Sequence, residues 1–132
     1  MVKLYIEEPE RDTVEAEVQA AETVVTSTIS WAEACSTFAR ALREGRIQED
    51  THQRMLDALA LDWPRFTTLN VVDSLSRHAG TLARQYALRG FDAIHLASAL
   101  HADRIVGDIR FLAFDAKLMN AARNAGLART EP

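Results

Sequence analysis

The sequence predicts a single α/β domain with a mainly parallel sheet, because short apolar segments alternate along the chain with helical patterns. Residues 23–26 are β-branched throughout and too few for a helix, which favours a strand. Residues 111–114 form a continuous apolar run, which is typical of a central parallel strand. A chain of 132 residues with 48% hydrophobic side chains is the right size for one ordinary core, so we expect one domain over residues 1–132.

Helix boundaries follow from capping residues and from proline. Ser30 is expected to open a helix that ends where Gly45 occupies a left-handed cap, and Pro64 ends the helix after it. The expected elements, in chain order, are a helical turn over 2–8 that ends at Pro9, a helix over 13–21, a strand over 23–26, helices over 30–44 and 48–62, a strand over 69–72, a helix from Asp73 or Ser74 to about Leu88 that is closed by Gly90, a helix over 92–101 that is apolar on most sides, a strand over 111–114, a helix that starts at Asp115 and ends at Gly126, and a weak edge strand over 127–129.

Charge and composition narrow the class of function. With 19 acidic and 15 basic side chains the net charge is −4, which argues against a protein that coats nucleic acid by charge alone. A net negative charge is compatible with a nuclease whose acidic site holds cations. One cysteine cannot form an internal disulfide, no apolar run approaches a membrane span, and the acidic start does not resemble a signal peptide. We therefore expect a cytoplasmic protein with no membrane partner.

Three carboxylates occupy similar positions in the predicted fold, near the start of a helix. Glu33 lies early in the helix after the first strand, Asp92 begins the apolar helix, and Asp115 directly follows the strand over 111–114. Groups just past the carboxyl ends of parallel strands collect along one edge of the sheet. Carboxylates brought together there either take up protons or hold a cation, and oxygen ligands alone favour Mg²⁺ or Mn²⁺.

The same acids have a purely structural interpretation, which stays open at this point. Ser30 and Glu33 have the spacing of a capping box, in which the glutamate binds the backbone of the capping serine. Asp92 and Asp115 could each be only the N-cap of a helix.

Other chemically active residues give weaker signals. The histidines show no zinc-binding spacing, and we expect His95 to be a hydrogen-bonded core residue. Cys35 is expected to pack as a small hydrophobe, and Trp31 and Trp63 as core or interface anchors. A basic stretch that could meet phosphate but is by default a solvated helix face comprises Arg40, Arg43 and Arg46.

Four segments together resemble a VapC-like PIN domain: VKLYIEEPE, TSTISWAEACSTFARAL, RGFDAIHLASAL and FLAFDAKLMNAARNAGL. The resemblance covers nearly the whole chain, in order. It implies a three-layer α/β/α fold and a ribonuclease dependent on Mg²⁺ or Mn²⁺. It also implies a toxin of a toxin–antitoxin pair, held by a cognate antitoxin and commonly a homodimer. The family's second, third and fourth acids, which serve catalysis and metal binding, fall on Glu33, Asp92 and Asp115.

This chain departs from the family's pattern at its amino end. The family opens with a short strand, central in its sheet, and an aspartate, and only then reaches the run that here occupies residues 2–5. Neither Glu7 nor Glu8 replaces that aspartate. A missing central strand leaves backbone N–H and C=O groups of its neighbouring strands without hydrogen-bond partners. Each such buried group costs about 1–3 kcal/mol of stability. The sheet could close around the gap, another chain could supply a strand, or the natural protein could begin further upstream, which is our hypothesis.

Three hypotheses of function follow. The first is RNA hydrolysis at the acidic site, weakened where one acidic ligand is lacking. The second is a catalytically impaired PIN domain that binds an antitoxin or dimerises, with Trp31, Phe38 and Leu42 as anchors. The third, a receiver-like domain with a phosphoacceptor acid, is least favoured, because its lysine and threonine partners have no place at the strand ends.

Overall fold

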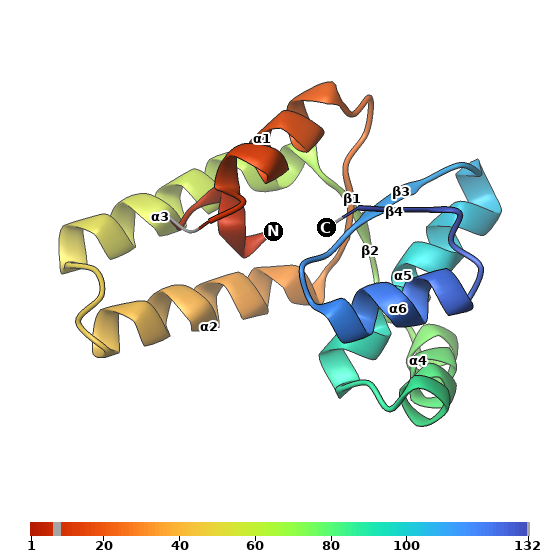
Figure 1. Ribbon diagram of the computed structural model, residues 1–132. Helices are drawn as coiled ribbons and strands as arrows, with labels where there is room; N and C mark the ends of the chain where they lie inside the picture. The colour runs from red at the N-terminus through yellow and green to blue at the C-terminus, as the bar shows by residue number, and fades with distance from the viewer. Residues whose placement is uncertain (7–8, 132) are drawn as a thin grey trace. The chain divides into compact units, whose positions relative to one another are not determined.

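The computed structural model describes residues 1–6 and 9–131, in which helices alternate with three-residue strands (Figure 1). This alternation confirms the α/β class. The elements are η1 (Val2–Leu4), α1 (Arg11–Ala20), β1 (Val25–Ser27), α2 (Ile29–Arg43), α3 (Glu49–Asp62), η2 (Trp63–Arg65), β2 (Thr67–Leu69), α4 (Asp73–Tyr86), α5 (Gly90–Val106), β3 (Arg110–Leu112), α6 (Ala116–Asn124) and β4 (Arg129–Glu131).

The described residues form two compact units. The first unit comprises Met1–Val24 and Thr28–Thr67, and the second comprises Val25–Ser27 and Thr68–Pro132, each in its described part. Each unit has its own cluster of buried apolar side chains. That residues 1–132 act as one domain stays a prediction.

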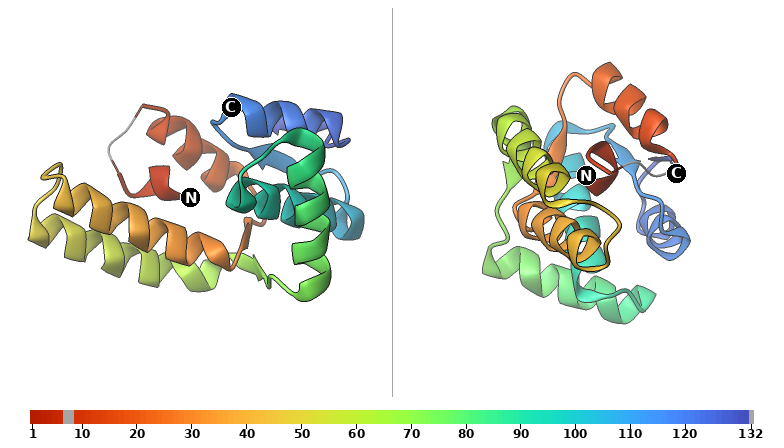
Figure 2. Two further views of the ribbon diagram at one scale, coloured as in Figure 1. Left: turned by 90° about the horizontal axis from the view of Figure 1, so that it is seen from below. Right: turned by 90° about the vertical axis from the view of Figure 1, so that its left-hand side faces the viewer.

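The first unit is built on a helical hairpin. Helices α2 and α3 lie side by side in each view (Figures 1 and 2), and Gly45 adopts a positive φ of 71° in the turn after α2, as predicted. Phe38 and Leu59 are fully buried between the helices. The ring of Tyr5 packs edge-on against Phe38 at 5.8 Å, so the amino-terminal segment covers the same core.

The second unit packs α4, α5 and α6 together. Small side chains allow these helices to approach closely, and α5 is buried along most of its length, as its apolar pattern predicts. The buried cluster consists of Leu75, Ala79, Leu82, Ala93, Leu96, Ala97, Ala99, Leu118, Ala121, Ala122 and Leu127. In the ranges that the structure describes, no helix is long and apolar enough to cross a lipid bilayer.

The strands form two separate pairs. Strand β3 runs parallel to β4, with Arg110 opposite Arg129, and β1 pairs with β2. Among the described residues, hydrogen bonding does not join the two pairs into one sheet. In the same part of the chain, the hydroxyls of Ser27 in β1 and Ser98 in α5 are buried without a hydrogen-bond partner.

Several predicted elements have other bounds in the structure, among them the edge strand predicted over 127–129, which is β4, Arg129–Glu131. The strand predicted over 69–72 is β2, Thr67–Leu69, because residues 70–72 turn toward α4: the N–H of Val72 donates to the carbonyl of Asn70. The helical turn predicted over 2–8 is confirmed only over Val2–Leu4, and residues 7 and 8 lie outside the described residues.

The junction between α4 and α5 also differs from the prediction. Helix α4 ends at Tyr86, and Ala87 takes the left-handed conformation that was expected of a glycine. Gly90 instead begins α5, which runs to Val106 and ends at Gly107 with a φ of 68°. The apolar pattern predicted too short a helix, because the last turn of α5 exposes Ile105 and Val106 to solvent.

Candidate functional site

The three predicted acids belong to different units. Glu33 lies on α2 in the first unit, whereas Asp92 and Asp115 lie at the starts of α5 and α6 in the second. In the part of the chain that the structure describes, no group of three or more His, Cys, Asp or Glu side chains is arranged to hold a metal ion. The gathering of these three carboxylates at one edge therefore stays a prediction.

Glu33 is not part of a capping box. Helix α2 begins at Ile29 with Thr28 as its N-cap, so Glu33 is the fifth helical residue, and the side chain of Thr28 makes no cap hydrogen bond. Its carboxyl is half-buried and carries negative charge close to the amino end of the chain. Burial lowers the pKa of the Met1 amino group, and the charge of Glu33 partly opposes this. The structural interpretation as a cap is wrong for this residue.

Asp92 is not an N-cap either. Arg89 is the residue that precedes α5, and Asp92 is third in the helix, in a half-buried position. A carboxylate in the first turn is stabilised by the partial positive charge of the helix amino end. Asp92 therefore lies in the first turn of α5 without being its N-cap, and its carboxylate oxygens are of the kind that could ligate a hard cation.

Asp115 is the one predicted acid that does cap a helix. The N–H of Leu118 donates to Oδ1 of Asp115 at 2.8 Å, and the carboxyl is exposed. The cap holds the side chain in one orientation and uses only Oδ1. Capping and cation binding through Oδ2 are therefore compatible in this residue.

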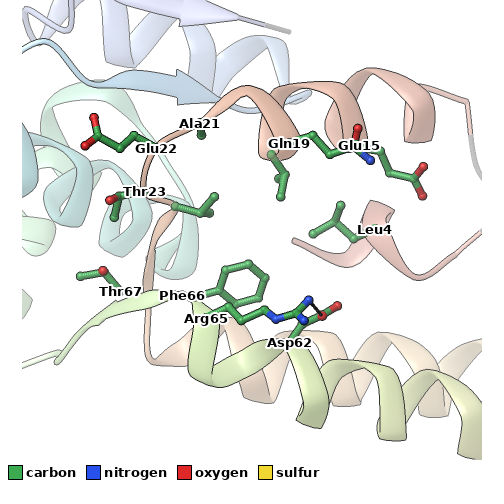
Figure 3. Close-up of a pocket in the computed structure, with 12 residues that line it drawn as sticks. Leu4, Glu15, Gln19, Ala21, Glu22, Thr23, Asp62, Arg65, Phe66 and Thr67 are labelled. Carbon is green, nitrogen blue, oxygen red and sulfur yellow. Dashed lines mark hydrogen bonds and ion pairs between the residues drawn. The ribbon is translucent and has the colours of Figure 1, made fainter.

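A cavity of about 520 Å³ opens within the first unit (Figure 3), and the sequence pattern gave no signal for it. One wall comes from α1 and the chain after it, with Glu15 and Glu22, and the opposite wall from the α3–η2 junction. There Arg65 pairs with Asp62 at 3.3 Å. None of the three predicted acids lines this cavity.

Asp62 also receives a hydrogen bond from Tyr5, whose hydroxyl donates to Oδ2 at 3.2 Å. Burial, and then the charge and hydrogen bond of Asp62, raise the pKa of Tyr5 above its ordinary value. This contact connects η1 to the end of α3 on the cavity side of the first unit.

The residues that gave weaker sequence signals are placed by packing contacts. Trp31 packs edge-on against Trp63 at 5.2 Å, which agrees with their expected role as packing anchors. Cys35 is half-buried against the first-unit core, as expected of a small hydrophobe. Phe38 is fully buried, so its predicted role as a surface anchor for a partner is wrong. All three arginines of the basic stretch, Arg40, Arg43 and Arg46, are exposed.

Comparison with known proteins identifies the class. The family model described as the PIN domain matches residues 1–124. The chain therefore belongs to the PIN domain family.

Within that family the chain is similar to curated VapC proteins. It is 32% identical over 131 residues to "Ribonuclease VapC45" of Mycobacterium tuberculosis (strain CDC 1551 / Oshkosh). It shares the same identity with "Ribonuclease VapC49" of Mycobacterium tuberculosis (strain ATCC 25618 / H37Rv). Each alignment covers 95% of this chain and 85% of the relative. The VapC-like character predicted from four segments is confirmed.

Proposed function

We propose that this protein is a metal-dependent ribonuclease, the toxin of a toxin–antitoxin pair, which acts in the cytoplasm and is held by a cognate antitoxin. The observation that carries the proposal is the PIN domain match over residues 1–124, together with relatives that are named ribonucleases. The acids that the resemblance assigns to the site are present as Glu33, Asp92 and Asp115, all near helix starts.

The donor set fits a hard divalent cation, Mg²⁺ or Mn²⁺, because all three side chains offer carboxylate oxygens. Glu33 and Asp92 are half-buried, and Asp115 keeps Oδ2 available beside its cap. When bound, the cation supplies an activated water and offsets charge on the phosphate. The chain's own part is to hold the oxygens in place: the first turn of α5 stabilises the carboxylate of Asp92, and the cap of α6 fixes that of Asp115.

The test is cleavage of a fluorogenic RNA during titration with Mg²⁺ or Mn²⁺. We expect activity that depends on the metal and falls to background in Asp92→Asn, which keeps the side-chain volume but loses the charge. Asp73→Asn is the matched control, since Asp73 is a first-turn acid of α4 that pairs with Arg77 on an exposed surface. Activity that survives in Asp92→Asn would come from a contaminating nuclease, and equal loss in both variants would contradict a special role for Asp92.

A second function, a PIN domain that binds an antitoxin or dimerises without cutting RNA, is favoured by one observation. The strands of the described residues stay in two separate pairs, with buried hydroxyls at Ser27 and Ser98 that lack partners. The decisive comparison uses the chain as printed and a version that carries a strand and an aspartate before residue 1. Cleavage by the extended version alone supports the nuclease with a fourth acid, whereas cleavage by neither supports the binding module. Sedimentation equilibrium of the same samples tests the homodimer that the resemblance implies.

A further inference from the structure

The start of α5 leaves an aromatic ring largely in solvent. Phe91, the second residue of the helix, is 59% exposed, whereas Ala93 is fully buried. Every other aromatic side chain in the part of the chain that the structure describes is less exposed. The next in order, Trp31, is 36% exposed and packs against Trp63. Phe91 is therefore the aromatic side chain that the fold leaves most accessible to a ligand.

Hydrogen bonds and packing hold the backbone on both sides of this ring. The N–H of Leu88 donates to the carbonyl of Ala83 at 3.1 Å, and Leu88 packs against the core of the second unit. The N–H of Ala93 donates to the carbonyl of Arg89 at 3.0 Å and closes the first turn of α5. A ligand that binds residues 89–91 would therefore not have to order a loose loop, which is one of the costs of binding.

Positive charge lies next to the ring in the sequence. Arg89 is exposed, and among the described residues no acidic side chain pairs with it, unlike Arg77, which pairs with Asp73. A Cβ atom added to Gly90 would meet no other atom within 4 Å, so the surface between Arg89 and Phe91 is open. An exposed guanidinium without an acidic partner is suited to bind phosphate.

We propose that Phe91 and Arg89 form a contact surface for RNA, in which Phe91 stacks on an unpaired base and Arg89 binds the phosphate group beside that base. A single exposed apolar side chain is common on protein surfaces. The adjacent guanidinium favours a nucleic acid over an apolar partner, because stacking on aromatic rings together with phosphate contacts is how proteins bind single strands. The inference rests on the proposed function, since Asp92, proposed to act on RNA, directly follows Phe91.

The experiment measures binding of a fluorescein-labelled single-stranded RNA to the full chain by fluorescence anisotropy, at low salt and with EDTA. Loss of one aromatic stacking partner weakens such binding by about 5–150-fold, and we expect a loss in this range for Phe91→Ala. Phe91→Leu keeps an apolar side chain but has no ring, and Phe91→Trp keeps a ring. Ile105→Ala is the matched control, because Ile105 is 66% exposed at the other end of the same helix.

The phosphate contact has its own measurement. The logarithm of the affinity falls with the logarithm of the salt concentration, with a slope of about 0.7 for each phosphate neutralised on a single strand. Arg89→Gln should lower this slope by about that amount. An unchanged slope would contradict the assigned role of Arg89.

The outcomes separate the inference from the function on which it rests. Weaker binding in Phe91→Ala and Phe91→Leu, with retained binding in Phe91→Trp and Ile105→Ala, supports the inference. Equal binding by the original chain and Phe91→Ala overturns it, as does full binding by Phe91→Leu, which would indicate an apolar contact. An equal loss for double-stranded RNA, whose bases already stack on each other, also overturns it. In each case metal-dependent cleavage by the original chain still tests the proposed nuclease separately.

Discussion

The two units of this protein bury their cores in different ways. In the first unit, the large side chains Phe38 and Leu59 fill the space around the α2–α3 hairpin. In the second unit, burial is divided almost equally between alanines and leucines, most of them on α4, α5 and α6. A core of large side chains concentrates stability in single residues, because an aromatic side chain buries far more surface than an alanine. The alanines of the second core allow close helix packing, and two of the three predicted acids lie at the starts of helices in that unit.

The largest expected effect is in the first unit. Phe38→Ala should lower the free energy of unfolding by about 3–5 kcal/mol, because the substitution removes buried surface and leaves a cavity. Urea denaturation measures this loss. Hydrogen exchange should show faster exchange mainly in α2 and α3, whose cluster contains Phe38.

The counterpart in the second unit is Leu96→Ala, with an expected loss of about 2–5 kcal/mol, since Leu96 is fully buried. Exchange should then accelerate mainly in α4, α5 and α6. Identical exchange patterns in the two variants would contradict the separation into two cores.

A smaller effect is expected at the start of α6, where stability and cation binding can be separated. Asp115→Ala should cost about 1 kcal/mol in metal-free protein, because the hydrogen bond to the N–H of Leu118 is lost. Asp115→Asn should cost little stability, since asparagine is an equally good N-cap, yet it removes the charge proposed to bind the cation. Thermal unfolding without metal and Mn²⁺ binding measure the two consequences. A loss of stability in Asp115→Asn as large as that in Asp115→Ala would contradict the cap.

The smallest effect is a pH dependence that belongs to the first unit. Burial and Asp62 raise the folded-state pKa of Tyr5 above its unfolded value near 10. The stability that Tyr5 contributes is therefore fully present below about pH 10 and is lost as the pH rises through the folded-state pKa. Urea titrations between pH 8 and 11 should show a steeper fall for the original chain than for Tyr5→Phe. Parallel curves would show that the contact between Tyr5 and Asp62 does not couple to folding.

The elements with explicit end signals were predicted well. Helices α2, α3 and α6 end where Gly45, Pro64 and Gly126 require them to end, and Asp115 caps α6 as expected. The predictions were wrong where residues do not adopt the backbone conformation that their type prefers. A β-branched run, Val71 and Val72, predicted a strand, but a turn before α4 uses those residues. Ala87 adopts a conformation that alanine disfavours, so the pattern placed the end of α4 too late.

The candidate site was predictable residue by residue but not as an assembly. Position relative to strands and helices selected Glu33, Asp92 and Asp115, and the structure shows that only Asp115 serves as a cap. Whether carboxylates meet depends on packing between elements distant in sequence, which no local pattern encodes. The cavity lined by Glu15 and Asp62 was missed for the same reason, since its walls come from separate parts of the chain.

The cap at Asp115 has a consequence for the resting state of the protein. Because the hydrogen bond from the N–H of Leu118 holds this carboxylate in place without any cation, the start of α6 stays capped when no metal is bound. At the cation site proposed above, a chelator would therefore remove the ion and leave this cap in place, so that the ion could bind again without refolding of the start of α6.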